Sequence, residues 1–503
     1  MLKNIKVFLL NPRSLFLDNI GTRQTVFKNT FWLALADGVT SLLRFVLIIY
    51  AARVLGAAGY GEFAFSLSFV SLFAILSDLG ISSIVTRDFA REKENEKEYP
   101  VIISAKIFLS VLALILTFIG SFFISQDFAI QKIIWVLMAF FFIDGFFSII
   151  YSFVRARQKM EYEALIKITE TVLTVLIGLF IIFWFPSAIN LSYAYLVASA
   201  IVLTGAALFF HFFVYFLKLN FNISSFKKIV KNAWPLSLGF VGMWIYINID
   251  STMIGFFGHA SEVGWYNASS RIAVSIMTVS GTLISGSFYP LLSRSFSESK
   301  AKLQKGWNYY MEIMIILAIP LMFGGIILAN QIIGFFYGLE NYGPSVFVFQ
   351  ALLIVTGISF LYYPYAMILI VAGNQKKNFL IIFLGATLNI ILNLVLVPKF
   401  GFYAAAVSTV AVTALALILV IPLSKRYASI SIFNLRLFKV LIAAIFSSLL
   451  MAMIIKRFAF YNLGIIAITA SGAFIYFISL LFLYRVFLKS DFFTRVYTSG
   501  KPR

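Results

Sequence analysis

The chain of 503 residues is 61% hydrophobic and only 12% charged, with a mean hydropathy of +0.96. Soluble domains average about 45–50% apolar residues, so this composition indicates a polytopic membrane protein. The sequence contains no Cys and only two His residues, which excludes disulfides and argues against metal or thiol redox chemistry. We therefore expect no catalytic centre and no metal site.

Apolar runs bounded by charged residues, Gly or Pro predict about 14 membrane-spanning helices, because about 20 apolar residues cross the hydrocarbon core of a bilayer. The fold class expected is an all-α polytopic membrane protein. The segment 1–28 shows no signal-peptide pattern and is expected to stay in the cytoplasm. The expected spans are 29–54, 62–84, 101–124, 132–154, 164–185, 192–217, 233–257, 266–290, 309–329, 345–371, 378–397, 402–422, 436–455 and 462–486.

The first two spans are expected to form a helical hairpin, because a short glycine-rich turn from Arg53 to Phe63 separates them. In the first span, Asp37, Ser41 and Arg44 share one helical face with Thr40. An Arg or Asp at the centre of a spanning helix costs about 2.5–3.5 kcal/mol on insertion scales. This face is therefore expected to look into protein or water. Two readings remain open: an Asp37–Arg44 ion pair that only locks helices together, or a transport site.

The two halves of the sequence carry similar short stretches at matching offsets, which is typical of a structural repeat in a transporter. Lys28-Asn29-Thr30-Phe31-Trp32-Leu33 corresponds to Lys231-Asn232-Ala233-Trp234-Pro235-Leu236, and Gly61-Glu62-Phe63 corresponds to Gly264-Trp265-Tyr266. The repeat predicts two pseudo-symmetric six-helix bundles with a cavity between them, and two extra helices that either buttress the second bundle or form a lipid-facing groove. The expected divisions are an N-terminal segment 1–28, an N-lobe 29–217, a linker 218–232, a C-lobe 233–422, two extra spans within 436–486 and a tail 487–503.

Most of the 40 Lys and Arg residues fall in alternate connections between the expected spans. The positive-inside rule places those connections and both termini in the cytoplasm, as expected for a multi-pass protein of the cell membrane. The net charge of +20 is explained by topology and by attraction to anionic headgroups, without a nucleic-acid partner. The external loops are short, which argues against a membrane-embedded glycan-transfer enzyme.

The eighth span is the most polar, because Arg271, Ser275, Thr278, Thr282 and Ser285 follow one another at helical spacing. Small-residue stripes often serve only close helix packing. An arginine on the same stripe favours the wall of a polar cavity, to which Ser275 and Thr278 would contribute together with Asp37 and Ser41.

Four further acids lie within expected spans, where each is expensive to insert. They are Asp78, Asp144, Glu170 and Asp250. A single such acid is more often a packing or pairing residue than a coupling site, but together they are candidates for ion coupling.

Three stretches resemble the polysaccharide flippases (Wzx-type, O-antigen) of the multidrug/oligosaccharidyl-lipid/polysaccharide exporter superfamily. The first is the turn Arg53-Val54-Leu55-Gly56 to Tyr60-Gly61-Glu62-Phe63. The second runs from Asp250-Ser251-Thr252-Met253-Ile254-Gly255 through Val263-Gly264-Trp265-Tyr266-Asn267 to Arg271-Ile272. The third runs from Asn389-Ile390-Ile391-Leu392-Asn393 through Val397-Pro398-Lys399-Phe400-Gly401 to Ala404-Ala405-Ala406.

The resemblance implies a two-lobed, fourteen-helix transporter that moves a polyprenyl-diphosphate-linked oligosaccharide to the outer leaflet by alternating access. Arg44 and Arg271 are then candidates to bind the diphosphate, with membrane lipids and polysaccharide polymerases or glycosyltransferases as partners. An ion-coupled multidrug exporter is the alternative within the same fold. No nucleotide-binding Gly-x-x-x-x-Gly-Lys-Ser/Thr loop is present, so we expect no cofactor beyond a coupling ion, Na⁺ or H⁺, or the membrane potential.

Overall fold

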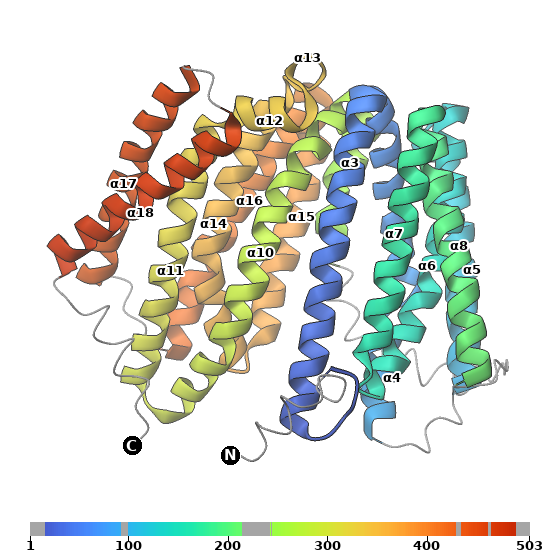
Figure 1. The fold of residues 1–503 in the computed structure, drawn as a ribbon, viewed down its shortest axis with the longest axis horizontal. Coiled ribbons are helices and arrows are strands. Elements are labelled where there is room, and N and C mark those ends of the chain that lie inside the picture. Colours follow the sequence, from blue (N-terminus) through green and yellow to red (C-terminus); the bar gives the residue numbers. More distant parts are fainter. Residues whose placement is uncertain are drawn as a thin grey trace. The chain divides into compact units, whose positions relative to one another are not determined.

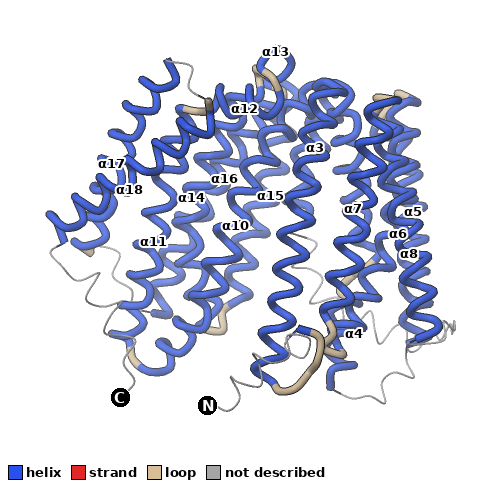
Figure 2. The backbone as a smooth tube through the Cα atoms, in the orientation of Figure 1, coloured by secondary structure: helices blue, strands red, loops and turns tan. Residues whose placement is uncertain are grey.

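The computed structural model describes residues 16–91, 99–213, 242, 244–428, 434–460 and 464–488, and within these ranges a few side chains, among them those of 278–285, are not described. The described residues form α-helices joined by short loops (Figures 1 and 2). Chain contacts divide the protein into two compact units, Met1–Gly264 (unit 1) and Trp265–Arg503 (unit 2).

Unit 1 contains six labelled helices, one short 3₁₀ helix and a helical segment over 244–257. The labelled elements are α3 (Thr22–Ala74), η1 (Ile75–Ser77), α4 (Ile81–Arg91), α5 (Tyr99–Ile124), α6 (Phe128–Ala156), α7 (Met160–Trp184) and α8 (Ala188–Phe213).

Helix α10 (Ala260–Glu298) begins in unit 1 and continues into unit 2. The remaining helices are α11 (Lys300–Ile327), α12 (Ala329–Tyr337), α13 (Leu339–Tyr342), α14 (Ser345–Val371), α15 (Gln375–Phe400), α16 (Phe402–Ala428), α17 (Leu435–Phe460) and α18 (Ile465–Leu488).

Eleven helices within the described ranges are long and apolar enough to cross a membrane. One of them contains the first expected span, 29–54, and most of the second, 62–84. Helix α3 continues across a kink at Gly56, whose φ of 69° lies in the left-handed region that favours glycine. Figure 1 shows the start of α3 and helix α4 toward the same end of unit 1, so the chain reverses at this kink. The protein is an all-α multi-pass membrane protein, and the count of about 14 spans stays a prediction.

The expected second span, 62–84, is interrupted in the structure. Helix α3 ends at Ala74, η1 follows, and Leu79 (φ 37°) and Gly80 (φ 78°) adopt left-handed conformations before α4 begins. A left-handed non-glycine residue costs about 1–2 kcal/mol and persists only where its surroundings hold it. The apolar pattern continues through this break and therefore does not reveal it.

The structural boundary between the units lies later in the chain than the expected linker 218–232, which is outside the described residues. The segment 244–264 is grouped with unit 1 because it packs on the second limb of α3. The indole Nε1 of Trp244 donates a hydrogen bond to the carbonyl oxygen of Ser71 at 2.7 Å, and Gly255 lies against the ring of Phe65. The two-lobe division stays a prediction.

Helices α6 and α14 contain the fourth and tenth expected spans, which the internal repeat pairs with each other. The two helices end with the same backbone geometry. Gln158 (φ 57°) and Gly373 (φ 73°) are left-handed at the helix ends. The next backbone amide in each case donates back into the helix, from Lys159 to Val154 at 3.0 Å and from Asn374 to Leu369 at 2.8 Å. This geometry is common at helix ends, and the internal repeat stays a prediction.

Helices α17 and α18 pack against each other and α17 packs against α11 within unit 2. The hydroxyl of Tyr476 on α18 donates to the carbonyl of Ile316 on α11 at 2.7 Å. A polar cluster of Arg436, Glu312 and Tyr484 joins the same three helices, with the Tyr484 hydroxyl 2.6 Å from the Glu312 carboxylate. These contacts support the buttressing role for the last two spans.

Cysteine labelling tests the orientation of α6, whose 29 residues extend about 44 Å and therefore cross a bilayer. Gln126 and Lys159 are exposed in the turns that precede and follow this helix. We expect a membrane-impermeant maleimide added outside intact cells to label Gln126→Cys, and to label Lys159→Cys only after permeabilisation. The unsubstituted protein, which has no Cys, is the control. Labelling of both positions from one face would contradict the span, and the reverse pattern would contradict the orientation.

Candidate functional site

The polar face predicted on α3 is present and exposed. Asp37, Ser41 and Arg44 are all exposed, with 67% of the Asp37 side chain and 48% of the Arg44 side chain accessible. Thr40 is buried, and its hydroxyl donates to the carbonyl of Asp37 at 3.3 Å. Charged side chains in membrane helices face protein or a water-filled cavity, because the hydrocarbon does not solvate them. This face is therefore suited to line a polar cavity.

The two charges on this face pair with α7 and not with each other. Arg44 lies 3.4 Å from a carboxylate oxygen of Glu170, and Asp37 lies 3.2 Å from the ammonium of Lys167. Asp37 and Arg44 are two turns apart, a rise of about 10 Å that exceeds the reach of an ion pair. The alternative of an Asp37–Arg44 lock is therefore not what the structure shows.

Glu170 is buried, so its charge needs compensation from more than one direction. Besides the guanidinium of Arg44, it accepts a hydrogen bond from the hydroxyl of Ser199 on α8 at 3.0 Å. Asp144 on α6 interacts electrostatically with Glu170, with Arg44 and with Lys106. Charges from α3, α5, α6 and α7 thus influence one another inside unit 1.

A second part of the network extends from Lys167, which sequence analysis had counted only as a topology signal. The ammonium of Lys167 binds Glu163 at 2.9 Å in addition to Asp37. Glu163 is fully buried and accepts two hydrogen bonds from the guanidinium of Arg155, at 2.6 and 2.7 Å. The four-residue spacing of Glu163 and Lys167 on α7 was the available signal.

The helix break after η1 holds a third charged group. The ammonium of Lys106, which is fully buried, lies 3.2 Å from the carboxylate of Asp78 and donates to the hydroxyl of Ser148 at 3.0 Å. Asp78 also accepts a hydrogen bond from Ser82 in α4. Sequence analysis identified Asp78 but gave Lys106 no role, although a lone Lys inside the apolar run 101–124 was a visible signal. Broken helices with charged groups at the break are typical of transporter sites.

Arg271 on α10 differs from Arg44, because no described residue forms an ion pair with it. Its Nε atom is buried without a hydrogen-bond partner in the same part of the chain. Ser275 is exposed one turn further, with its hydroxyl bonded back to the Arg271 carbonyl at 2.7 Å. The side chain of Thr278 lies outside the described residues. An unpaired guanidinium is well suited to receive an anion.

Asp250 is 5% exposed in the helical segment over 244–257 and belongs to unit 1. Arg44 also belongs to unit 1, whereas Arg271 belongs to unit 2. A common cavity for Arg44 and Arg271 stays a prediction. Among the described residues, no group of three or more His, Cys, Asp or Glu side chains is arranged to hold a metal ion.

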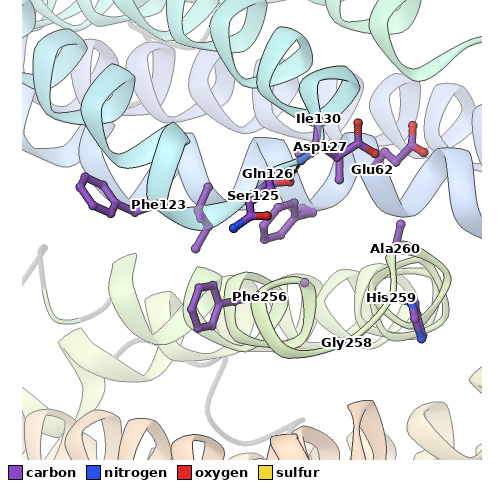
Figure 3. A pocket seen from close by; sticks show the side chains of 13 residues that line it. Glu62, Phe123, Ser125, Gln126, Asp127, Ile130, Phe256, Gly258, His259 and Ala260 are labelled. Atoms are coloured by element: carbon purple, nitrogen blue, oxygen red, sulfur yellow. Dashed lines mark hydrogen bonds between the residues drawn. The ribbon is translucent and has the colours of Figure 1, made fainter.

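A pocket of about 580 Å³ that sequence analysis did not predict lies in unit 1. It is lined by α3 just after its kink, by the turn between α5 and α6, and by the turn between the segment 244–257 and α10. Figure 3 shows Glu62 and Asp127 together on one side of this pocket, with Phe256 and His259 on the other side. Gln126 adds an amide. Its acidic lining distinguishes it from the basic groups described above.

Comparison with known proteins identifies relatives of this chain. The family profile described as "Polysaccharide biosynthesis protein" matches residues 26–296. The chain is 25% identical to the probable flippase AglR of Haloferax volcanii over 379 residues, which cover 72% of this chain and 76% of AglR. It is 23% identical to the probable low-salt glycan biosynthesis flippase Agl15 of the same organism, over 73% of this chain and 76% of Agl15.

Solved structures show the same fold. The lipid II flippase MurJ in an inward closed conformation aligns with a TM-score of 0.73 at 16% identity, over 90% of this chain and 99% of MurJ. An inward-facing multidrug resistance MATE family transporter aligns with a TM-score of 0.61 at 16% identity, over 78% of this chain and 94% of the transporter. Since the family profile covers more than half of the sequence, this chain belongs to the polysaccharide biosynthesis protein family.

Proposed function

We propose that this protein moves a polyprenyl-diphosphate-linked oligosaccharide from the cytoplasmic to the outer leaflet of the cell membrane by alternating access. The observation that carries the proposal is the guanidinium of Arg271, whose buried Nε has no hydrogen-bond partner and which has no ion-pair partner among the described residues. The exposed charged face of α3 supports it, and so do the names of the relatives AglR and Agl15.

The chemistry of such a lipid matches these features. A sugar–diphosphate headgroup cannot cross hydrocarbon unaided, whereas the polyprenyl tail can stay in the lipid. The headgroup therefore needs a polar path with positive charge, and a guanidinium can bind diphosphate oxygens through paired, charge-assisted hydrogen bonds. Arg271 is free for this role, while Arg44 would have to share its charge between the ligand and Glu170.

The charged network of unit 1 is our candidate for energy coupling. Each acid of this network interacts with a basic side chain. The pairs are Asp37 with Lys167, Asp78 with Lys106 and Glu170 with Arg44, and Asp144 interacts electrostatically with Arg44 and Lys106. Protonation of one carboxylate, or binding of Na⁺ beside it, would weaken the ion pair with its basic partner. The relative stability of two arrangements of these helices would then change. We propose that H⁺, Na⁺ or the membrane potential drives the cycle through this network.

The proposed substrate is tested in proteoliposomes that contain the purified protein and a polyprenyl-diphosphate-linked N-acetylglucosamine with a fluorescent sugar. We expect the probe to become accessible to a quencher on the opposite side faster than in protein-free vesicles. A cationic dye should not be transported, because Arg271 repels cations. Transport of the dye without movement of the lipid probe would favour the multidrug exporter.

Substitution of the two arginines should separate ligand binding from folding. We expect Arg271→Gln to reduce probe transport about 10-fold or more without lowering the amount of folded protein, since a charge-assisted hydrogen bond contributes about 1.5–3 kcal/mol. Arg271→Lys keeps the charge but loses the paired N–H donors of the guanidinium, so its rate of probe transport should be intermediate. Arg294→Gln, the same change at an exposed position of α10, is the matched control.

Arg44→Gln should instead lower the folded yield, because it leaves the buried Glu170 carboxylate unpaired. Glu170→Gln in the same chain should restore that yield. Folded yield is measured by size-exclusion chromatography of a fluorescent fusion. Normal transport per folded molecule in both Arg271→Gln and Arg44→Gln would contradict a role of these arginines in diphosphate binding.

The Asp78–Lys106 pair tests coupling. Asp78→Asn should destabilise the protein, because it leaves the ammonium of Lys106 buried without its counter-charge. The double variant Asp78→Asn with Lys106→Met should fold again and should transport without responding to imposed pH, Na⁺ or potential gradients. Transport by the unsubstituted protein that already ignores all three gradients would argue against coupling.

A further inference from the structure

The pocket beside Glu62 is large enough for a small organic ligand. Its volume of about 580 Å³ lies in the range of about 300–1,000 Å³ that is usual for ligand pockets in proteins. All of its walls belong to unit 1: the second limb of α3, the turn between α5 and α6, and the chain that leads from the segment 244–257 into α10. We call it the Glu62 pocket.

The turn between α5 and α6 is held in place by its own hydrogen bonds. The Asp127 carboxylate accepts a hydrogen bond from the amide of Ala129 at 2.8 Å and so caps α6. The amide of Asp127 donates to the hydroxyl of Ser125 at 3.1 Å, and the buried side chain of Gln131 donates to the carbonyl of Ser125 at 2.8 Å. Gln126 is exposed between these residues. Groups on such an ordered turn lose little freedom when a ligand binds.

The polar groups of the pocket are mostly hydrogen-bond acceptors. The Glu62 carboxylate is half-buried and makes no hydrogen bond or ion pair with any residue that the structure describes. Asp127 adds the carboxylate oxygen that does not cap α6, and the two acids interact electrostatically. The side-chain amide of Gln126 is also without a partner in the described ranges. Because an ionised carboxylate only accepts hydrogen bonds, the pocket suits a ligand that is rich in donors.

Two exposed phenyl rings accompany these acceptors. Phe123, near the end of α5, is 80% exposed, and Phe256 is 51% exposed. Both line the pocket, and Figure 3 shows Phe256 across it from Glu62 and Asp127. The face of an aromatic ring carries partial negative charge, so the weakly positive C–H groups of a ligand can pack on it. A sugar matches both walls, because it presents hydroxyl donors at its edge and C–H groups on its faces.

Other classes of ligand match this lining less well. A diphosphate offers only acceptors, and the two carboxylates would repel it. A metal ion would lack ligands, because no three His, Cys, Asp or Glu side chains among the described residues are arranged to hold one. An organic cation would match the charge of the acids but would leave the N–H donors of Gln126 without an acceptor, whereas a hydroxyl group both donates and accepts.

We propose that the Glu62 pocket binds a neutral sugar of the transported headgroup at the outer side of the membrane. This inference rests on the proposed function and on the topology that places the turn between α5 and α6 outside. Glu62 and Asp127 accept hydrogen bonds from neighbouring hydroxyls, Gln126 donates to a sugar oxygen, and Phe256 packs on a sugar face. Arg271 carries only donors and binds the diphosphate, so different side chains recognise the two parts of the headgroup.

Protection of an engineered thiol tests sugar binding without any transport. The reporter is His259→Cys, at an exposed position of the pocket in a chain that has no other thiol. Its reaction with a fluorescent maleimide is measured in the purified protein, with neutral hexoses, N-acetylhexosamines and their disaccharides as probes. We expect at least one of these sugars to slow labelling several-fold and inorganic diphosphate to have no effect. Glu340→Cys, an exposed position of α13 outside the pocket lining, should label at the same rate throughout.

Two outcomes of this experiment would overturn the proposal. One is protection of His259→Cys by tetraethylammonium and by no sugar, which would make the pocket a site for organic cations. The other is unchanged labelling with every sugar of the panel.

Substitutions of the lining test which side chains hold the sugar. Added to the His259→Cys reporter, Glu62→Gln keeps the size of the side chain and removes its charge, and should raise the sugar concentration needed for protection about 10-fold. Phe256→Ala should raise it several-fold, whereas Phe257→Ala, the same change at a neighbour that does not line the pocket, should not. Gln126→Ala, at an exposed position, provides the test if Glu62→Gln does not fold. Unchanged protection in the folded variants of Glu62 or Gln126 and of Phe256 would contradict the assignment.

A pair of lipids separates this pocket from the diphosphate site. One lipid is the polyprenyl-diphosphate-linked N-acetylglucosamine, and the other is polyprenyl diphosphate without sugar. Glu62→Gln should lower affinity for the first lipid several-fold and leave affinity for the second unchanged, whereas Arg271→Gln should lower both. An equal loss for both lipids in Glu62→Gln would argue against a sugar site.

Failure of the pocket and failure of the proposed function give different results. Protection of His259→Cys by a sugar, together with no lipid transport by the unsubstituted protein, would reject the proposed function and retain the sugar site. Lipid transport without protection by any sugar would reject the sugar site and retain the proposed function.

Discussion

The cost of placing charge inside a membrane determines how this molecule is built. Each charged side chain within a span needs a partner or water, because the hydrocarbon offers neither. Unit 1 meets this requirement with pairs between neighbouring helices, such as Arg44 with Glu170 and Lys106 with Asp78. These pairs bind the helices of unit 1 together. They also leave one polar face of α3 exposed, and the function proposed here depends on that face.

Arg271 on α10 has no such partner in the described part of the chain, and this contrast with Arg44 is the basis of the proposal. A cation with a protein partner is explained by packing, whereas a cation without one needs a ligand or water.

Much of this organisation could be predicted from the sequence. The composition, the hairpin turn around Gly56 and the polar face of Asp37, Ser41 and Arg44 indicated a polytopic transporter, because helical periodicity and insertion cost act locally. The choice of partners could not be predicted. Whether Arg44 meets Asp37 or Glu170 depends on which helix packs beside α3, a long-range property that a single sequence does not contain. The break at Leu79 was hidden by an apolar pattern that continues through it.

The most direct test of the central claim is the binding of lipid headgroups to the purified protein. Polyprenyl diphosphate, polyprenyl monophosphate and uncharged polyprenol share one tail and differ only in headgroup charge. If the guanidinium of Arg271 holds the diphosphate, affinity should be highest for the diphosphate, should fall with added salt, and should drop selectively for the diphosphate in the Arg271→Gln protein. Equal affinity for the three lipids, or a preference for the diphosphate that Arg271→Gln leaves intact, would contradict this account.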